Sequence, residues 1–398
     1  TALLVYSNTE IEGVYGASTI RPSFTAAGDA SLTGNNRAKG ACFLNANYYA
    51  TSQTDKNISV TGIHFDYQDR PSYDSNGNAI SPNWGQKVGV FIRFAANVKV
   101  IKCSQKFGGD LSGFQHCFNT QASDCFSEEI GNCAHDHWAS SGNIIISNNT
   151  MVNNTVKVNQ ALMVTGDDTN PQTSAILGTG SSNKIVIEGN VVMSINGTVN
   201  TGIILNSLNA GASVSKAVID ANYVEGTNFG IALENDVQDV IISNNIINAP
   251  ATQGILGVSP LNDPNQNVIV SDNLIKNVAS GGIGIDFVRA TKLSIHGNQA
   301  SGIVKSPLTI TQANITEANP GVFTSNGHGL INNDLVSYTS NGTNLVTSVG
   351  TVADGTNFYI VNKTDNTFQI SATKGGTALQ VTNDGNDSQV FTPILNAC

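Results

Sequence analysis

The phrase "QDVIISNNIINA", residues 238–249, is the most informative in the chain because close variants of it return several times. A run of Val and Ile leads to Asn, and more apolar residues follow. The phrase recurs as "GNIIISNNTMVN" (142–153), "NKIVIEGNVVMS" (183–194) and "QNVIVSDNLIKN" (266–277). Short apolar runs bounded by turn residues are typical of buried strands. The repetition predicts similar coils, each with a strand on either side of an Asn-containing turn.

The spacing of these turns indicates the architecture. The turn positions are 41, 32, 23, 28 and 25 residues apart, at Asn149, Asn190, Asn222, Asn245, Asn273 and Asn298. The short spacings define a coil, and the long ones contain loops at 169–182 and 207–215. Ile63 and Cys103 fit the same position upstream, and the segment 124–132 supplies a further coil. A period this short predicts a β-solenoid, and because no Leu-x-x-Leu-x-Leu frame exists we expect a parallel β-helix of about nine recognisable coils.

Two properties of Asn explain its place in the phrase. Asn tolerates the left-handed backbone that a sharp turn requires. Stacked Asn amides can also hydrogen-bond to one another along the solenoid axis, as side-chain ladders do in cross-β stacks.

A second strand precedes each phrase, as in "GIALEND" (230–236) and "GIGIDF" (282–287). Side chains alternate along a strand, so Ile231 and Leu233 are expected in the core and Glu234 outside. Applied to every coil, the alternation predicts one outward column: Arg93, a His-rich coil, Thr165, Asn206, Glu234, Val258 and Asp286.

Composition excludes several classes of partner. The net charge is −10 and no Lys/Arg cluster exists, so no nucleic-acid partner is expected. No apolar run approaches the roughly 20 residues of a membrane span, so no membrane insertion is expected. No P-loop or dinucleotide fingerprint is present, so no cofactor is expected. The six Cys form no CxxC pair, which argues against zinc and predicts stacked buried thiols.

The repeats end near residue 310, and the sequence pattern changes to strands of alternating apolar and polar residues with Gly/Asn turns. The predicted organisation is therefore all-β, with a parallel β-helix over 1–310 and a small sandwich or barrel-like β module over 311–398. The chain begins within the repeat pattern, and we expect a processed or shortened start.

Two segments carry a resemblance to known families. The opening "LVYSNTEIEGVYGASTIRP" (4–22) resembles the entry coil of the pectate-lyase-like right-handed β-helix superfamily. The segments "HGLINNDLVSY" (328–338) and "GTNFYIVNKTDNTFQIS" (355–371) are similar to a small β module of bacteriophage tail proteins. Together they resemble a phage tailspike or capsule depolymerase. The resemblance implies an extracellular or virion-borne protein that degrades or binds bacterial surface polysaccharide, usually as a homotrimer. The resemblance does not identify catalytic residues in this chain.

The first candidate site is the acidic part of the outward column. Glu234 and Asp286, two coils apart, are expected about 9–10 Å from each other, because neighbouring strands lie about 4.8 Å apart. That is near the roughly 6.5–9.5 Å between the carboxyls of inverting glycosidases. Asn206, Asp236 and the pair Asp167/Asp168 are expected on the same face. Solvent-facing carboxylates are also ordinary on an acidic protein.

The second candidate is "NCAHDHWASS", residues 132–141. His135 and His137 are expected on one outward face with Asp136 opposite; a shift of one residue would turn the histidines inward and Asp136 outward. His116 and Arg93 follow on the two preceding coils. The set suits β-elimination on a uronate, with His as base, Arg93 as clamp and Trp138 as stacking platform. Alternatively, His135 and His137 could hold a metal, or the histidines could be partly buried structural residues.

Other residues could assist either site. Glu128 and Glu129 could supply an acid to the His-rich coil. Trp84, on the Gly/Pro/Asn-rich segment 70–86, could form a sugar-binding rim with Tyr67 and Tyr73, or simply pack against the solenoid.

These observations lead to one prediction with two alternatives. The protein is expected to be a polysaccharide depolymerase, with hydrolysis through Glu234 and Asp286 favoured. The alternatives are a lyase that uses His116, His137 and Arg93, and a glycan-binding adhesin without chemistry.

Overall fold

The computed structural model describes residues 2–22, 40–48, 54–68, 87–166, 182–207, 212–259, 264–279, 282–301, 308–328, 330, 332–385 and 387–394. The chain forms two compact units. The first comprises Thr1–Lys276 with Ile283–Gln299, and the second comprises Asn277–Gly282 with Ala300–Cys398. No helix among the described residues is long and apolar enough to cross a membrane.

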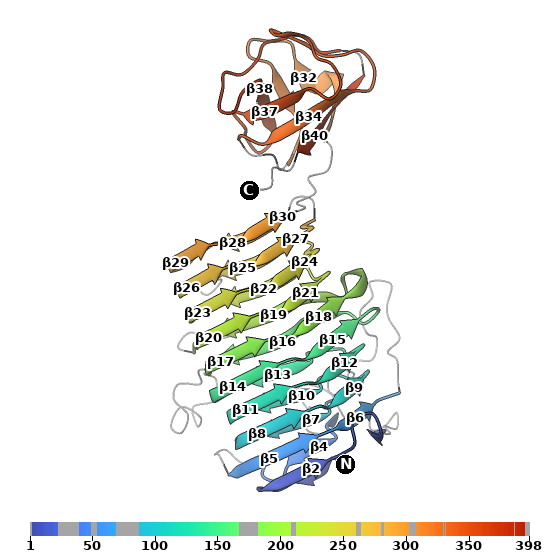
Figure 1. The fold of residues 1–398 in the computed structure, drawn as a ribbon, viewed down its shortest axis with the longest axis vertical. Helices are drawn as coiled ribbons and strands as arrows, with labels where there is room; N and C mark the ends of the chain where they lie inside the picture. The colour runs from blue at the N-terminus through green and yellow to red at the C-terminus, as the bar shows by residue number, and fades with distance from the viewer. Residues whose placement is uncertain are drawn as a thin grey trace. The chain divides into compact units, whose positions relative to one another are not determined.

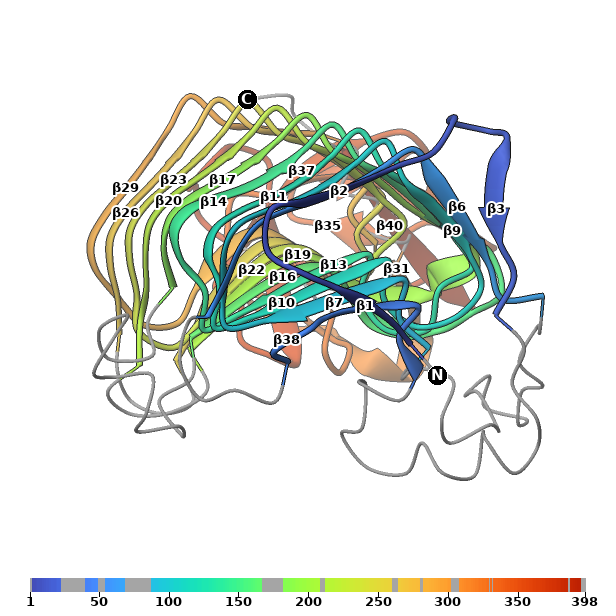
Figure 2. The same cartoon turned by 90° about the horizontal axis from the view of Figure 1, so that it is seen from below.

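The first unit is a right-handed parallel β-helix built from three sheets of ten parallel strands each (Figure 1). Every coil contributes one strand to sheet A, one to sheet B and one to sheet C, and we number the coils 1 to 10 from the N-terminus. Viewed along the stack of coils, the strands of each sheet lie behind one another (Figure 2). The predicted fold class is confirmed, with ten coils where about nine were recognisable from the sequence.

Sheet A contains β1 (Leu3–Val5), β4 (Phe43–Asn45), β7 (Val90–Arg93), β10 (Ser112–Gln115), β13 (His135–Trp138), β16 (Val158–Gly166), β19 (Val199–Ser207), β22 (Phe229–Glu234), β25 (Gln253–Val258) and β28 (Ile283–Phe287). Sheet B contains β2 (Thr9–Glu12), β5 (Asp55–Thr61), β8 (Ala95–Ile101), β11 (Phe118–Ser123), β14 (Ser141–Ser147), β17 (Ser182–Glu188), β20 (Val214–Asp220), β23 (Val237–Ser243), β26 (Asn265–Ser271) and β29 (Ala290–His296). Sheet C contains β3 (Ser18–Ile20), β6 (Ile63–Asp66), β9 (Ser104–Lys106), β12 (Phe126–Glu128), β15 (Thr150–Asn153), β18 (Val191–Ser194), β21 (Tyr223–Glu225), β24 (Ile246–Asn248), β27 (Leu274–Lys276) and β30 (Gln299–Ser301). One 3-10 turn, η2 (Ile195–Gly197), follows β18.

Alternate side chains of each strand fill the lumen of the solenoid. In coil 8, Ile231, Leu233, Val240, Ile242 and Ile247 are fully buried. Burying one such side chain contributes about 1.5–3 kcal/mol. A single coil cannot cover these side chains, so the stack as a whole, not any one coil, supplies the core.

The repeated Asn residues form a buried ladder through coils 5 to 10. Each side-chain amide donates to the Oδ1 of the Asn on the next coil at 2.8–2.9 Å, through Asn149, Asn190, Asn222, Asn245, Asn273 and Asn298. The predicted ladder is confirmed. The expectation that the ladder Asn itself has the left-handed backbone was wrong. The left-handed residue is the one before each ladder Asn, for example Asn244 with φ 54° before Asn245.

The described cysteines are buried thiols, as predicted. Cys42, Cys103, Cys117, Cys125 and Cys133 are all buried. Burial raises the pKa of Cys103 to about 11 and that of Cys117 to about 12, so both thiols are protonated and unreactive. Cys398 lies outside the described residues.

The second unit contains an antiparallel sheet of seven strands and a separate sheet of three. The larger sheet comprises β31 (Leu308–Thr311), β32 (Ile315–Thr316), β33 (Val322–Thr324), β34 (Leu335–Ser340), β37 (Asn357–Val361), β38 (Thr367–Ser371) and β40 (Ser388–Ile394). The smaller comprises β35 (Val346–Thr347), β36 (Gly350–Thr351) and β39 (Val381–Asn383), and η3 (Gln312–Asn314) follows β31. Aromatic residues fill its core, with Phe323, Phe368 and Phe391 packed ring against ring. The expected boundary at 310/311 falls within β31, which already pairs with β40.

Candidate functional site

The outer face of sheet A carries one column of side chains that runs through seven consecutive coils. The strand register aligns Arg93, Gln115, Trp138, Thr165, Asn206, Glu234 and Val258. We call Trp138, Thr165, Asn206 and Glu234 the sheet A track. Its two ends are three coils apart, or about 14 Å between Cα atoms. The register agrees with the predicted column from Thr165 to Val258, and Trp138, not a histidine, is the contribution of coil 5.

Glu234 lies at the end of the track beside apolar surface. Ile204, Ala232 and Leu256 form a buried cluster on the same outer face, with Val258 packed against it. Glu234 is half-buried, and desolvation raises the pKa of its carboxyl above the ordinary value. A raised pKa favours the protonated carboxyl, which can donate its proton to a leaving group, so the environment suits a general acid.

A second carboxylate follows Glu234 after a sharp corner. Asn235 has a left-handed backbone with φ 58°, and its amide donates to the carbonyl of Ser207 at 3.0 Å. Asp236 comes next, and two residues span at most about 7 Å between Cα atoms. The side-chain amide of Gln238 donates to the Asp236 carboxylate and orients it. The corner therefore places a second acidic residue, Asp236, two residues after Glu234 at the end of the track.

The expected pairing of Glu234 with Asp286 was wrong in its register. Asp286 is on the outer face of β28, but it pairs with Leu256, whereas Glu234 pairs with Val258. Two coils and a two-residue offset separate the acids by about 12 Å between Cα atoms. The two acids therefore do not share one column. Gly–Ile lies near the start of both strands, but Ile255 of β25 pairs with Ile285 of β28 and not with Ile283, which shifts Asp286 by two residues along the face.

The expected outward position of His135 and His137 was also wrong. Both imidazoles are fully buried in the lumen, where Nδ1 of His135 is 2.7 Å from the Ser112 hydroxyl and Nδ1 of His137 is 2.9 Å from that of Thr120. Burial lowers the pKa of His135 to about 3 and that of His137 well below its usual range. Asp136 takes the outward position, although it too is covered, at 1% exposure. The alternative register, shifted by one residue, is the one that the protein adopts.

Arg93 and His116 meet at one aromatic ring. The Arg93 guanidinium lies 4.6 Å from the centre of the Phe94 ring, and the His116 ring stacks on Phe94 at 4.9 Å. His116 is buried, and Arg93 also lies 5.9 Å from the Tyr48 ring. Of the three residues expected to act in a lyase, Arg93 and His116 lie close together, whereas His137 is buried inside the solenoid.

Several predicted residues cannot be placed on this face. Trp84, Tyr73, Asp167 and Asp168 lie outside the described residues. Tyr67 is not part of a sugar-binding rim, because it is buried in the core and its hydroxyl donates to the carbonyl of Val88 at 2.7 Å.

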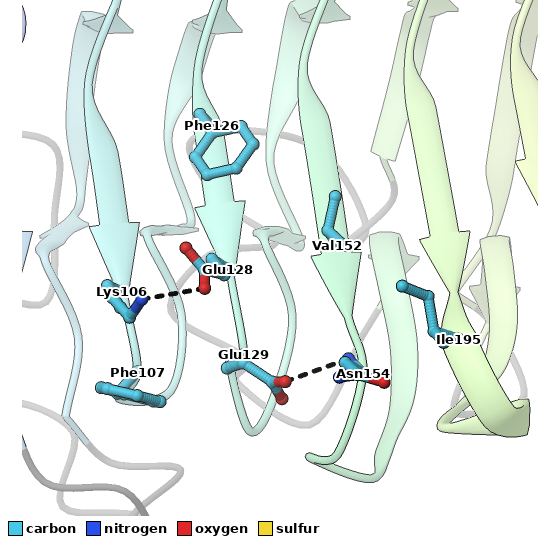
Figure 3. Close-up of a pocket in the computed structure, with 8 residues that line it drawn as sticks. All are labelled: Lys106, Phe107, Phe126, Glu128, Glu129, Val152, Asn154 and Ile195. Carbon is cyan, nitrogen blue, oxygen red and sulfur yellow. Dashed lines mark hydrogen bonds and ion pairs between the residues drawn. The ribbon is translucent and has the colours of Figure 1, made fainter.

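A depression of about 500 Å³ lies on a different face, at the ends of the sheet C strands (Figure 3). Apolar side chains line it together with a few polar groups: Lys106, Phe107, Phe126, Glu128, Glu129, Val152, Asn154 and Ile195. The Lys106 ammonium is 2.9 Å from the Glu128 carboxylate, and Lys106 also pairs in register with Asp66 on coil 2. The depression offers aromatic surface beside the Lys106–Glu128 ion pair.

Glu129, which also lines this depression, has a structural role. Its carboxylate accepts hydrogen bonds from the backbone N–H groups of Asn154, Thr155 and Val156 at 2.9–3.2 Å. Glu128 and Glu129 were both considered as acids for the His-rich coil. Glu129 instead anchors the turn after β15. Sequence reasoning missed Phe126, which precedes Glu128 by two residues on β12, and Lys106, which only the register of coils 3 and 4 brings beside Glu128.

No group of three or more His, Cys, Asp or Glu in the described part of the chain is arranged to hold a metal ion. His135 and His137, considered as a ligand pair, project into the lumen among hydroxyl and apolar side chains.

No protein-family model and no curated protein matches the sequence. Among solved structures, the chain is similar to the tailspike of Escherichia coli bacteriophage HK620 in complex with a hexasaccharide, at 11% identity and a TM-score of 0.34, over 89% of this chain and 71% of that one. It is similar to the DFA-IIIase of Arthrobacter chlorophenolicus A6 in complex with GF2, at 14% identity and a TM-score of 0.47, over 75% and 74%. It is also similar to an exopolygalacturonase of Thermotoga maritima, at 12% identity and a TM-score of 0.40, over 75% and 79%. All three are right-handed β-helix proteins, and the likeness is one of fold.

Proposed function

We propose that this protein binds a bacterial surface polysaccharide along the sheet A track and hydrolyses it at Glu234. The observation that carries the proposal is the alignment of a half-buried carboxyl, whose pKa burial raises, with Asn206 and Trp138 in one column. The indole offers a stacking surface for a sugar ring, and Asn206 offers hydrogen bonds to hydroxyls.

The chemistry follows from the two carboxyls at the corner. Glu234 donates its proton to the glycosidic oxygen as the bond from that oxygen to the anomeric carbon breaks. Asp236 accepts a proton from the water that attacks the anomeric carbon. The products are two shorter chains, one of which carries a new reducing end. Asp286 lies outside the column of Glu234 and is not assigned this role.

The setting of the activity is part of the same proposal. We expect the protein to act outside the cell or on a virion, as a phage tail protein does, and to assemble as a homotrimer. Arg93 extends the column two coils beyond Trp138, so acidic polysaccharides are the first substrates to test.

The test is digestion of a panel of acidic and neutral bacterial exopolysaccharides, followed for reducing ends and for the ultraviolet absorbance of unsaturated uronates. Reducing ends without absorbance are expected. Glu234→Gln should lower the rate about 10²–10⁴-fold, the usual contribution of a general acid, and Asp236→Asn should act in the same direction. Asp286→Asn and Asp272→Asn are the matched controls and should keep the wild-type rate.

Each other outcome has a distinct meaning. Absorbance that rises with cleavage would replace hydrolysis by β-elimination and move attention to Arg93 and His116. Retention of polysaccharide without any cleavage, lost in Trp138→Ala, would make the protein an adhesin. An unchanged rate in Glu234→Gln would remove Glu234 from the mechanism.

A further inference from the structure

The depression on sheet C, which Figure 3 shows, contains an aromatic ring that its neighbours do not cover. Phe126 pairs in register with Ser104 on coil 3 and with Thr150 on coil 5. Because both neighbours are small, the Phe126 ring remains partly exposed. Glu128 follows two residues later on the same strand and pairs with Val152, so both side chains lie on the same outer face as the ring. The depression therefore has apolar surface and a carboxylate side by side.

Polar groups beside the ring retain hydrogen-bonding capacity. The Lys106 ammonium has three N–H donors and gives one of them to Oε1 of Glu128 at 2.9 Å. Within the described part of the chain, Oε2 of Glu128 accepts no hydrogen bond. The Lys106 and Glu128 side chains are 41% and 38% exposed, so a ligand can reach both. Asn154 is exposed on coil 5, and its Oδ1 accepts from Asn196 at 3.2 Å, which leaves its side-chain NH2 group directed to no described residue.

The charges around the depression favour an uncharged ligand. Lys106 contributes one positive charge, and Glu128 and Glu129 contribute two negative charges. The carboxylates oppose an anion, and the ammonium opposes a metal ion. A sugar ring meets the remaining requirements, because its C–H face packs on an aromatic ring while its hydroxyls both donate and accept hydrogen bonds. The volume of about 500 Å³ lies within the roughly 300–1,000 Å³ of ligand sites.

We propose that the sheet C depression is a second, non-catalytic site that binds neutral sugar units of an oligosaccharide or polysaccharide. One sugar ring stacks on Phe126. Its hydroxyls donate to Glu128 and accept from Lys106 and from the Asn154 amide. Ile195, which is 42% exposed on coil 6, continues the apolar surface towards the next sugar unit. The lining residues span coils 3 to 6, about 14 Å, which accommodates a short oligosaccharide.

This site is separate from the sheet A track, because its residues belong to sheet C and to the turns that follow it. The inference goes beyond the proposed function and requires no hydrolysis at Glu234. On a long polysaccharide that occupies both sites, the second contact is intramolecular once the first has formed, so the overall affinity exceeds that of either site alone.

The test is sugar binding to the full chain, measured by saturation-transfer NMR and isothermal titration calorimetry. Maltotriose, cellotriose and β-1,4-mannotriose are the neutral probes, and trigalacturonate is the acidic probe. We expect at least one neutral probe to bind with a dissociation constant on the order of 1 mM. Trigalacturonate at the same concentration should not displace it, because the carboxylates of the site repel an anion.

Variants of the lining residues locate the bound sugar. Phe126→Ala should abolish saturation transfer, and Phe126→Leu, which keeps apolar volume without a flat ring, should weaken binding about tenfold. Glu128→Ala removes the acceptor for the sugar hydroxyls and should also weaken binding about tenfold. Phe118 is 38% exposed on sheet B of the same coil, so Phe118→Ala is the matched control and should keep the wild-type affinity.

The other outcomes contradict the proposal in different ways. If none of the three neutral probes binds, the depression is not a sugar site. Unchanged affinity in both Phe126 variants would overturn the assigned position, and so would binding that is lost in Trp138→Ala, since that result places the sugar on sheet A. Tighter binding of trigalacturonate than of every neutral probe would refute the ligand class. Loss of hydrolysis in Glu234→Gln concerns the catalytic proposal alone, because these binding measurements involve no cleavage.

Discussion

Asn222 donates both its backbone N–H and its side-chain amide to one oxygen, the Oδ1 of Asn245, at 3.0 and 2.9 Å. Asn245 repeats the arrangement towards Asn273. Each amide also donates to a backbone carbonyl on the preceding coil, that of Ile219 in the case of Asn245. The ladder therefore satisfies the backbone groups that a tight turn leaves unpaired, in a place that water does not reach.

Removing one rung should destabilise the solenoid. Asn245→Ala leaves the Asn222 donors without their acceptor and the carbonyl of Ile219 without its donor, and each such buried group costs about 1–3 kcal/mol. We expect the free energy of unfolding to fall by about 3 kcal/mol in urea titrations followed by circular dichroism. Thr291→Ala, an exposed change on coil 10, should stay within about 0.5 kcal/mol. Equal effects of the two variants would show that the ladder contributes nothing specific.

Glu234 should cost stability at neutral pH. Its pKa is raised in the folded protein, so the folded state binds a proton more tightly than the unfolded state and stability declines as pH rises from about 4.5, the ordinary value, through the raised one. Glu234→Gln removes this penalty. We expect the variant to melt at a higher temperature than the wild type at pH 7, with the difference vanishing near pH 4. A variant less stable than the wild type at pH 7 would contradict the assigned environment.

The buried histidines should make the solenoid acid-sensitive. The folded-state pKa of His135 is lowered to about 3, so the unfolded state takes up protons first and stability falls as pH drops below about 6.5. At pH 5 the loss is about 2 kcal/mol for a histidine of ordinary unfolded pKa. His135→Gln should flatten the curve of unfolding free energy between pH 7 and 5. His296→Gln, on the exposed last coil, should keep the wild-type curve; identical curves for all three proteins would refute the expectation.

Substitution of the adjacent residues Glu128 and Glu129 should have very different effects on the free energy of unfolding. Glu129→Ala leaves the N–H groups of Asn154, Thr155 and Val156 without their acceptor, and we expect a loss of about 3 kcal/mol in unfolding free energy. Glu128→Ala removes only a half-exposed ion pair with Lys106, worth about 0–1 kcal/mol. Urea unfolding of the two variants side by side provides the comparison. A larger effect at Glu128 would reverse the assignment of these side chains.

The repeat was readable from sequence because its cause is local. A Val/Ile run, a left-handed residue and an Asn recur through coils 5 to 10, and the parallel β-helix and the Asn ladder followed from this pattern. The clustering of Cys in a repeating chain likewise predicted the buried thiols. The alternation within a single strand was also sufficient for Glu234, whose outward position needs only its neighbours Ile231 and Leu233.

The arrangement of the candidate site residues could not be predicted, because it depends on the register between strands of neighbouring coils. Whether Asp286 aligns with Glu234 is decided by the pairing of β25 with β28, and a two-residue offset there moves the acid along the face. Likewise, one residue of register placed His135 and His137 in the lumen and Asp136 outside. A strand repeats every two residues, so a shift of one exchanges its inner and outer faces, and only the stacked hydrogen bonds between coils select the register. The sequence by itself determined the repeat and its turns; the tertiary structure decided which side chains share a column, because register is a property of neighbouring coils.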